Sequence, residues 1–331
     1  MSLQAKLKRI GLDTYLFLLL GTVALATVLP ASGLGAVVVS KVAYYAVALL
    51  FFLYGAKLNS AAVLAGLANW RLQLLVFGAT YLAFPLLGLG LSSALSPWLD
   101  PNLVLGILFL AVLPSTVQSS IAFTALARGN VPAAVCAASV SNLVGVFLTP
   151  ALAALLLHTG GAGGINADAV FSICLQILLP FALGQLLRRW VGKWIERNKR
   201  LTLVVDRGSI LLIVYSAFSA GIVAGVWNQV EPSMLAMVVA ADIVLLFAIM
   251  MFGRLAAKAA GMSYEDNAVM LFCGSTKSLA SGLPIANILF AGQAISLIVL
   301  PLMLFHQIQL LVCAVIAQRH ANRLELQVQV A

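Results

Sequence analysis

Long apolar segments alternate with short polar connections along this chain. There are ten such segments, and each is about 20 residues long, the length that a helix needs to cross the hydrocarbon core of a bilayer. The pattern therefore predicts an all-α integral membrane protein with ten transmembrane helices. The expected segments cover residues 14–29, 36–56, 72–95, 102–128, 132–157, 168–187, 207–227, 233–253, 264–289 and 293–317.

The fourth and ninth segments are polar in the middle, where lipid would surround an ordinary membrane helix. The ninth reads Gly274-Ser275-Thr276-Lys277-Ser278 there, and the fourth reads Pro114-Ser115-Thr116. A charge at the bilayer centre costs at least about 2.5–3.5 kcal/mol. Two broken helices at matching places in two halves are typical of a transporter's binding site. The expected ion- or substrate-binding residues at this crossover are Ser115, Thr116, Gln118, Ser119, Ser120, Ser275, Thr276, Lys277 and Ser278.

Asp242 is the only carboxylate deep in any segment, so Asp242 and Lys277 are candidates for an intramembrane pair. Such a pair is either structural, or one member titrates or binds an ion during transport. Serine, threonine and other polar side chains also bond between packed membrane helices without any further role. With that alternative open, the supporting residues expected near the crossover are Thr80, Ser139, Asn142, Asp242, His306 and Gln307.

Lysine and arginine gather in alternate connections between the segments, and this predicts the orientation. With the N-terminus inside, the inside connections hold 17 of the 19 Lys and Arg residues and the outside connections hold none. The two exceptions, Lys41 and Lys277, lie within segments. Because positive charge marks the cytoplasmic side, both termini are expected in the cytoplasm. The basic stretch 188–200 is expected to be an inside loop.

Five segments in each half give the halves opposite orientations, which predicts an inverted repeat. The first repeat covers residues 14–157, and the second covers 168–317. A glycine-rich run at 160–164 is expected to join them on the outside. The basic and apolar N-terminus also resembles a removable secretory signal, but the repeat requires it as the first helix.

Composition supports a membrane location, since 63% of the 331 residues are hydrophobic and 9% are charged. Soluble domains have roughly 45–50% apolar and 25% charged residues. The net charge of +9 reflects membrane topology rather than nucleic-acid binding, because the basic residues lie between apolar segments. Neither a phosphate-binding loop nor a zinc-protease motif occurs, and the four cysteines have no metal-like spacing. We expect a protein that is not an enzyme, without a cofactor or metal site.

The stretches around the two breaks resemble the bile acid:sodium symporter family, and within it the branch of sodium/bile-acid cotransporter 7. The matching residues run from Leu113 to Pro150 and from Gly274 to Gln307, and the resemblance covers about residues 10–320. It implies a panel domain (about 14–56 and 168–227) and a core domain (about 72–157 and 233–317). Helices four and nine would be unwound where they cross, and substrate would bind between panel and core.

The sodium ligands that this resemblance implies match unevenly. The polar pair of the fourth segment corresponds to Ser119 and Ser120, and a third-segment glutamine corresponds to Thr80. The hydroxyls of the fifth segment fall at Ala134 and Ala138. Ser139, Ser141 or Asn142 would have to substitute for them.

At the ninth-segment break the resemblance implies an acidic residue and a glutamine, but the matching stretch, 273–277, has no carboxylate and ends in Lys277. An ammonium repels a cation a few ångströms away. We therefore expect the Lys277 ammonium to take the place of one bound cation, with transport that is sodium-independent or proton-coupled through Lys277.

Together these features predict a secondary transporter of an organic, anionic solute that works by alternating access in the inner or plasma membrane. Its partners would be the solute and the lipid bilayer, with no nucleic acid or obligate protein partner. Either Na+ or H+ would be the coupling ion, or the protein would be a facilitator without one. A cation/proton antiporter that uses Asp242 and Lys277 is the alternative within transport. A regulatory or scaffold membrane protein and an intramembrane enzyme are the alternatives from other classes.

Overall fold

The computed structural model describes residues 14–57, 69–157, 167–225, 228, 230–290 and 293–330. Within these ranges the regular secondary structure is helical, and one or more helices lie at each expected segment. The basic N-terminal residues and the glycine run at 160–164 lie outside the described residues. The helices without a break are α2 (Thr14–Val28), α3 (Gly33–Lys57), α9 (Val131–Leu157), α10 (Ala167–Arg197), α11 (Lys199–Val223), α12 (Pro232–Ala259) and α15 (Ile295–Val330).

The fourth and ninth segments are each divided into two helices, as the polar residues predict. In the fourth, α7 (Pro101–Ala111) and α8 (Gln118–Leu126) are separated by residues 112–117. In the ninth, α13 (Tyr264–Ser275) and α14 (Leu279–Leu289) are separated by residues 276–278. The backbone of the second break is extended, with φ −95° and ψ 152° at Thr276 and φ −84° and ψ 108° at Ser278.

The third segment contains a wide turn that the sequence did not reveal. It consists of α5 (Trp70–Gly78), a π-helical turn η2 (Ala79–Ala83) and α6 (Phe84–Leu95). In this turn the Phe84 N–H bonds to the carbonyl of Ala79, five residues back. The next residue, Pro85, has no N–H. The carbonyl of Thr80 therefore has no helical donor, since both its α-helical and its π-helical partners are lost.

Six helical stretches in the described part of the chain are long and apolar enough to cross a membrane. Their outward faces carry large apolar side chains, such as Leu34 and Leu82, which are 86% and 63% exposed. Side chains of this kind are stable on a protein surface when lipid covers them. The six stretches are Gly33–Lys57, Trp70–Leu95, Val131–Leu156, Arg200–Val223, Pro232–Ala259 and Ile295–Ala321.

The basic stretch 188–200 is helical, so the prediction of a loop there is wrong. Helix α10 continues to Arg197, and α11 begins at Lys199, after a single non-helical residue. The stretch has no proline, and its arginine, lysine and tryptophan residues are compatible with a helix. The Arg189 guanidinium lies 3.7 Å from the ring of Trp190, as suits an amphipathic helix end at the membrane surface.

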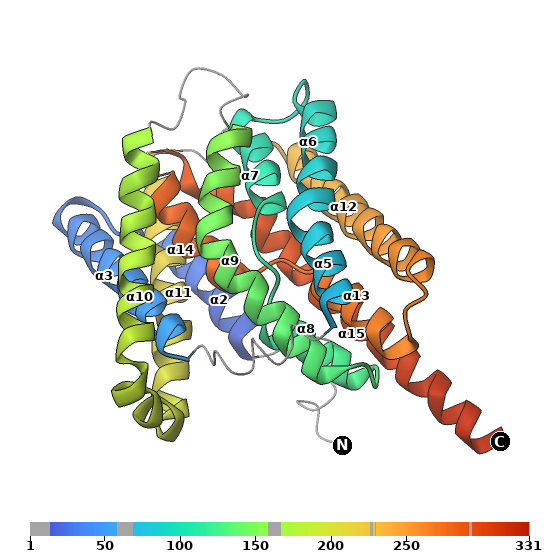
Figure 1. Cartoon of the computed structure of the whole chain (residues 1–331). Coiled ribbons are helices and arrows are strands. Elements are labelled where there is room, and N and C mark those ends of the chain that lie inside the picture. Colours follow the sequence, from blue (N-terminus) through green and yellow to red (C-terminus); the bar gives the residue numbers. More distant parts are fainter. Residues whose placement is uncertain are drawn as a thin grey trace.

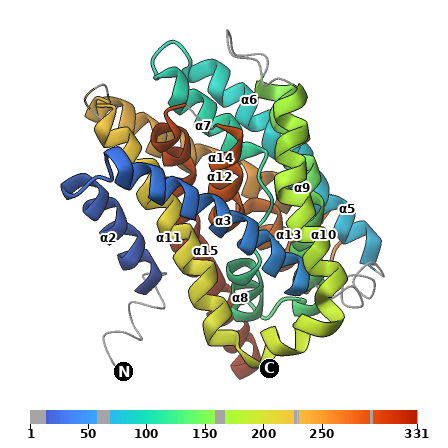
Figure 2. The ribbon, with the colours of Figure 1, turned by 90° about the vertical axis from the view of Figure 1, so that its left-hand side faces the viewer.

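Helices α2, α3, α10 and α11 form one side of the molecule, and α5, α6 and α12 form the opposite side (Figures 1 and 2). Helix α3 packs along α10 and α11, and α11 packs against α2. Glycines allow α3 and α10 to touch through their backbones. A Cβ added to Gly55 would lie 2.0 Å from the Phe181 carbonyl oxygen, and one added to Gly184 would lie 2.0 Å from that of Phe52.

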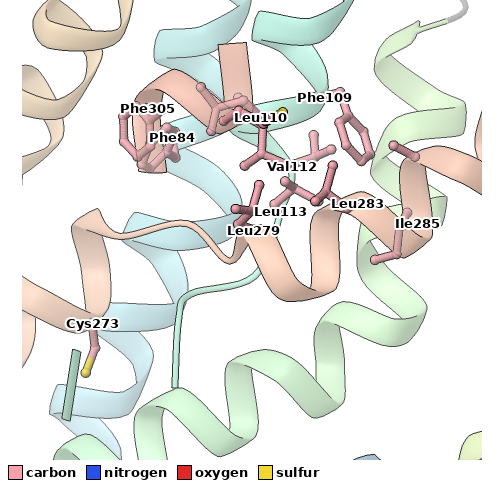
Figure 3. Close-up of a cluster of buried hydrophobic side chains, with 14 of the residues drawn as sticks. Phe84, Phe109, Leu110, Val112, Leu113, Cys273, Leu279, Leu283, Ile285 and Phe305 are labelled. Atoms are coloured by element: carbon pink, nitrogen blue, oxygen red, sulfur yellow. The ribbon is translucent and has the colours of Figure 1, made fainter. Parts of the chain in front are cut away.

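The two breaks lie in the interior, with α9 and α15 packed near them. Buried apolar side chains from the first break and from the helix ends beside both breaks pack together, including Val112 and Leu113 of the first break and Leu279 and Leu283 of α14 after the second (Figure 3). This apolar cluster separates the irregular backbone from lipid, which non-helical segments at membrane depth require.

Candidate functional site

Direct hydrogen bonds join the two breaks to each other. The Ser278 N–H donates to the Pro114 carbonyl at 2.9 Å. The Thr276 hydroxyl lies 3.1 Å from the Ser115 hydroxyl and 3.2 Å from that of Thr116. The sequence thus brings together two polar segments that are far apart along the chain, and most of the expected crossover residues take part.

Three backbone carbonyls of the first break accept hydrogen bonds from side chains of α9 and α8. The Thr149 hydroxyl donates to Val112 at 2.9 Å, and the Asn142 amide donates to Ser115 at 2.7 Å. The Ser120 hydroxyl, from α8 at the end of the break itself, donates to the carbonyl of Thr116, one turn back. A buried backbone group without a partner is costly in lipid, so these side chains make the break stable.

Two further carbonyls at the first break, those of Ala111 and Leu113, accept hydrogen bonds from Lys277. The Lys277 Nζ lies 2.8 Å from the Ala111 oxygen and 2.7 Å from the Leu113 oxygen. A third bond, of 2.9 Å, goes to the Thr80 carbonyl that the π-turn and Pro85 leave without a helical donor. We call these three oxygens the carbonyl cage.

The carbonyl cage matches the hydrogen-bonding capacity of an ammonium group. An ammonium has three N–H donors and no acceptor, and each of the three oxygens can only accept. The Lys277 side chain is fully buried, and Nζ also lies 4.1 Å from the centre of the Phe84 ring. Hydrogen bonds to a charged group contribute roughly 1.5–3 kcal/mol each. Three of them exceed the insertion cost of about 2.5–3.5 kcal/mol for a charge at this depth.

The peptide groups of Lys277 are held by Gln309, a fully buried residue of α15. The Lys277 N–H donates to Gln309 Oε1 at 2.8 Å, and Gln309 Nε2 donates to the Lys277 carbonyl at 2.8 Å. The same Nε2 lies 2.8 Å from Nδ1 of His306, one turn earlier in α15. We call this paired contact between Gln309 and the Lys277 backbone the Gln309 clamp.

A cavity of about 420 Å³ lies beside the crossover. This volume is within the roughly 300–1,000 Å³ of small-molecule sites. Helices α2, α3, α10 and α11 line one side of it, and both breaks, α8, α9, α14 and α15 line the other. Its polar wall consists of Thr116, Gln118, Ser119, Ser139, Asn142, Ser278, Ser281, His306 and Gln307, and its charged side chains are Lys57 and Arg207.

Some expected residues lie at the crossover in other roles than expected. Thr80 contributes its carbonyl, while its hydroxyl bonds to Val76 in its own helix. The Ser275 hydroxyl likewise bonds back to Leu271 within α13. Ser139 and Asn142 of α9 lie in the cavity wall beside the first break.

The structure does not bring Asp242 and Lys277 together. Asp242 is fully buried on α12, and neither of its carboxyl oxygens has a hydrogen-bond partner among the described residues. The Lys277 ammonium bonds to the three carbonyls of the cage instead. The expected intramembrane pair is therefore not formed in this structure.

Sequence reasoning missed Gln309 and the three cage oxygens. A signal for Gln309 was present, because it follows His306 by three residues and helix positions three apart share a face. The carbonyls had no such signal, since every residue carries one. Their availability depends on where the helices break and on the π-turn before Pro85.

Comparisons with known proteins agree with a transporter. The sequence pattern of the SBF-like CPA transporter family matches residues 13–322. The chain is 56% identical over 312 residues to "Uncharacterized protein PA2026" of Pseudomonas aeruginosa, covering 94% of this chain and 93% of that protein. It is 46% identical over 320 residues to "Putative symporter YfeH" of Escherichia coli K12, covering 97% and 96%. It is 30% identical over 281 residues to sodium/bile acid cotransporter 7 of Rattus norvegicus, covering 83% and 82%.

Proposed function

Because the chain belongs to the SBF-like CPA transporter family, a family of membrane transporters, we propose that it moves an organic anion through the cavity by alternating access, with the Lys277 ammonium in place of one bound cation. The observation that carries this proposal is the carbonyl cage, in which a tethered ammonium takes the backbone oxygens that two irregular helices leave free.

The proposal includes ten membrane-spanning segments in two inverted repeats, residues 14–157 and 168–317. Helices α2, α3, α10 and α11 would form the panel domain, and the remaining helices would form the core. The position of the cavity supports this division, because panel helices line one side and the crossover lines the other. Movement of the core relative to the panel would then open the cavity to alternate sides of the membrane.

Charge in the cavity supports an anionic solute. Lys57 of α3 and Arg207 of α11 line it, and its described lining includes no carboxylate. The rest of the panel side is apolar, with Leu19, Phe51 and Phe181 among its residues. A solute with an anionic group and an apolar body would match both surfaces. A bile acid has this character, and the rat relative is named as a bile acid cotransporter.

The residues of the crossover do not fit a sodium ion at the carbonyl cage. Carbonyl oxygens are suitable ligands for a hard cation, but here the Lys277 ammonium bonds to all three. A second cation in contact with it would be repelled in the low dielectric of the interior. Loss of a proton from Lys277 would leave one carbonyl facing a lone pair. We infer that the ammonium stays charged and that the cage needs no sodium.

The cation/proton antiporter that uses Asp242 and Lys277 receives no support from the geometry. The two side chains do not bond to each other, and Asp242 is not among the cavity residues. We propose that the hydroxyl groups around the two breaks shape the cavity wall and hold the breaks together. These belong to Ser115, Thr116, Ser119 and Ser120 around the first break and to Thr276 and Ser278 around the second.

Transport in vesicles of defined salt composition tests this proposal. Purified protein in proteoliposomes would be assayed for uptake of taurocholate, an aromatic carboxylate and a dicarboxylate, in sodium or in choline medium. The wild-type protein is expected to take up at least one of these anions equally in both media. In Lys277→Ala, three buried carbonyls lose their donor, at roughly 1–3 kcal/mol each. Its thermal unfolding midpoint should fall, and added Na+ should restore part of the loss by occupying the cage.

Lys41→Ala is the matched control, because Lys41 also lies within a membrane helix but is exposed on α3. It should behave as the wild type does. Lys277→Met keeps most of the side-chain volume if the alanine variant does not fold. Strict sodium dependence of the wild type, or unchanged stability and uptake in the Lys277 variants, would overturn the role of the ammonium. Absence of uptake for every anion tested would overturn the solute class.

A further inference from the structure

His306 is connected to the backbone of the second break through Gln309, so a change in the protonation of His306 would affect that backbone. From the hydrogen bonds around it we propose that His306 is the proton-binding residue of this transporter, and that a proton there and an anion in the cavity are transported together. This inference rests on the proposed function, because it concerns the same cavity. It starts from the Gln309 clamp, whose donors and acceptors can be assigned without ambiguity.

The backbone of Lys277 fixes the orientation of the Gln309 amide. A peptide N–H can only donate and a carbonyl can only accept. The atom at 2.8 Å from the Lys277 N–H must therefore be the amide oxygen, and the atom at 2.8 Å from the Lys277 carbonyl must be the amide nitrogen. Turning the amide over would place two donors together at one end and two acceptors at the other.

This orientation in turn fixes the state of His306. The second hydrogen of Gln309 Nε2 faces Nδ1 of His306 at 2.8 Å. An amide nitrogen cannot accept a hydrogen bond, so Nδ1 must accept one. An imidazole that accepts at Nδ1 is neutral and carries its hydrogen on Nε2. In this structure the clamp is therefore compatible only with an unprotonated His306.

A proton on Nδ1 would compete with the clamp. Two N–H groups would then face each other at a distance of 2.8 Å, which is repulsive. An alternative acceptor is the Lys277 carbonyl, which lies 3.5 Å from Nδ1 and now accepts from Gln309. On protonation, the Lys277 carbonyl would accept from His306 instead of from Gln309. The Gln309 clamp would then lose one of its two hydrogen bonds to the extended backbone. A proton taken from cavity water would thus loosen the crossover.

The charges around His306 link this proton to the anion. Lys57 and Tyr54 of α3 and Arg207 of α11 line the same cavity, and the other described elements around it contribute no charged side chain. The Lys277 ammonium is turned toward the carbonyl cage, and Asp242, on the neighbouring α12, lies outside the cavity lining. Lys57 and Arg207 repel an imidazolium, and a bound anion offsets that repulsion. Binding of either ligand therefore favours the other, as reciprocal linkage requires.

Hydrogen exchange tests the proton site without any solute. Backbone exchange of the peptide that contains residues 276–279 would be measured at about pH 8 and about pH 5, the range in which histidine changes charge, and corrected for the intrinsic pH dependence of exchange. In the wild type, the corrected exchange rate should be roughly two- to tenfold higher at the acidic pH, because protonation of His306 removes one hydrogen bond that holds this backbone. His306→Asn should show no such change, because its amide oxygen can accept from Gln309 but does not titrate. His320→Asn, farther along α15, should behave as the wild type does.

Taurocholate uptake with and without an inward proton gradient tests the coupling. The ratio of the two uptake rates should exceed one for wild type and His320→Asn and should fall to one for His306→Asn. An acid-dependent opening in His306→Asn equal to that of wild type, or no opening in wild type, would overturn the inference. So would an unchanged uptake ratio in His306→Asn. If the wild type transports no anion, the proposed function fails, while the exchange measurement still decides whether His306 controls the break.

Discussion

Asp242 and Lys277 are both fully buried, but the structure treats them differently. The lysine bonds to three carbonyl oxygens. The carboxyl group of Asp242 has no hydrogen-bond partner among the described residues. A buried polar group without a partner costs roughly 1–3 kcal/mol in protein mutational data. At the scale of single residues, the lysine is therefore a stabilising part of the crossover, whereas the aspartate is a source of instability.

Substitution of Asp242 separates these two roles. Asp242→Leu should raise the thermal unfolding midpoint in detergent, because an apolar side chain of similar size replaces unpaired oxygens. Asp242→Asn should leave anion uptake at its wild-type rate. Loss of uptake in Asp242→Asn, measured beside Lys277→Met, would instead show that the carboxyl group serves transport and would revive the antiporter alternative.

At the scale of helices, the polar residues of the fourth and ninth segments predicted where the helices break. The sequence also indicated helical structure for every segment, because apolar runs of about 20 residues leave little else in a membrane. It failed at the helix ends, where α10 and α15 continue beyond the apolar runs. Hydropathy marks where lipid ends, but backbone hydrogen bonding decides where a helix ends. The π-turn at Ala79–Ala83 has no apolar or polar signature either.

The contact between α3 and α10 depends on glycine and provides a prediction at the same scale. A Cβ at Gly184 would lie 2.0 Å from the Phe52 carbonyl oxygen, and rigid backbone cannot give way cheaply. Gly184→Ala should therefore lower the free energy of unfolding by roughly 1–3 kcal/mol. Gly90→Ala on α6 is the control, because nothing lies within 4 Å of its added Cβ and alanine favours a helix by about 1 kcal/mol. Thermal unfolding of both variants measures the difference, and equal midpoints would contradict this account of the packing.

At the scale of the whole molecule, the distribution of charge indicates the side to which the cavity opens. Lys57 is the last residue of α3, and Arg207 lies in the first half of α11. Both belong to the connections that the positive-inside rule assigns to the cytoplasm, and both line the cavity. We propose that orientation and, with it, that the structure represents an inward-facing state, in which Lys57 and Arg207 lie toward the cytoplasmic side and His306 lies deeper, beside the crossover.

Labelling of single cysteines with a membrane-impermeant maleimide tests orientation and state together. The described native cysteines, Cys136, Cys273 and Cys313, are buried and form no disulfide, so background labelling from them should be low. In intact cells Ser96→Cys, at an exposed position in the connection between α6 and α7, should be labelled from outside. Gln118→Cys, which is exposed in the cavity wall, should be labelled only when the cytoplasmic face is accessible, as in inside-out vesicles. A transported anion should slow labelling of Gln118→Cys and leave that of Ser96→Cys unchanged. The reverse labelling pattern would invert the orientation and place the cavity mouth, with its two cations, on the outer side.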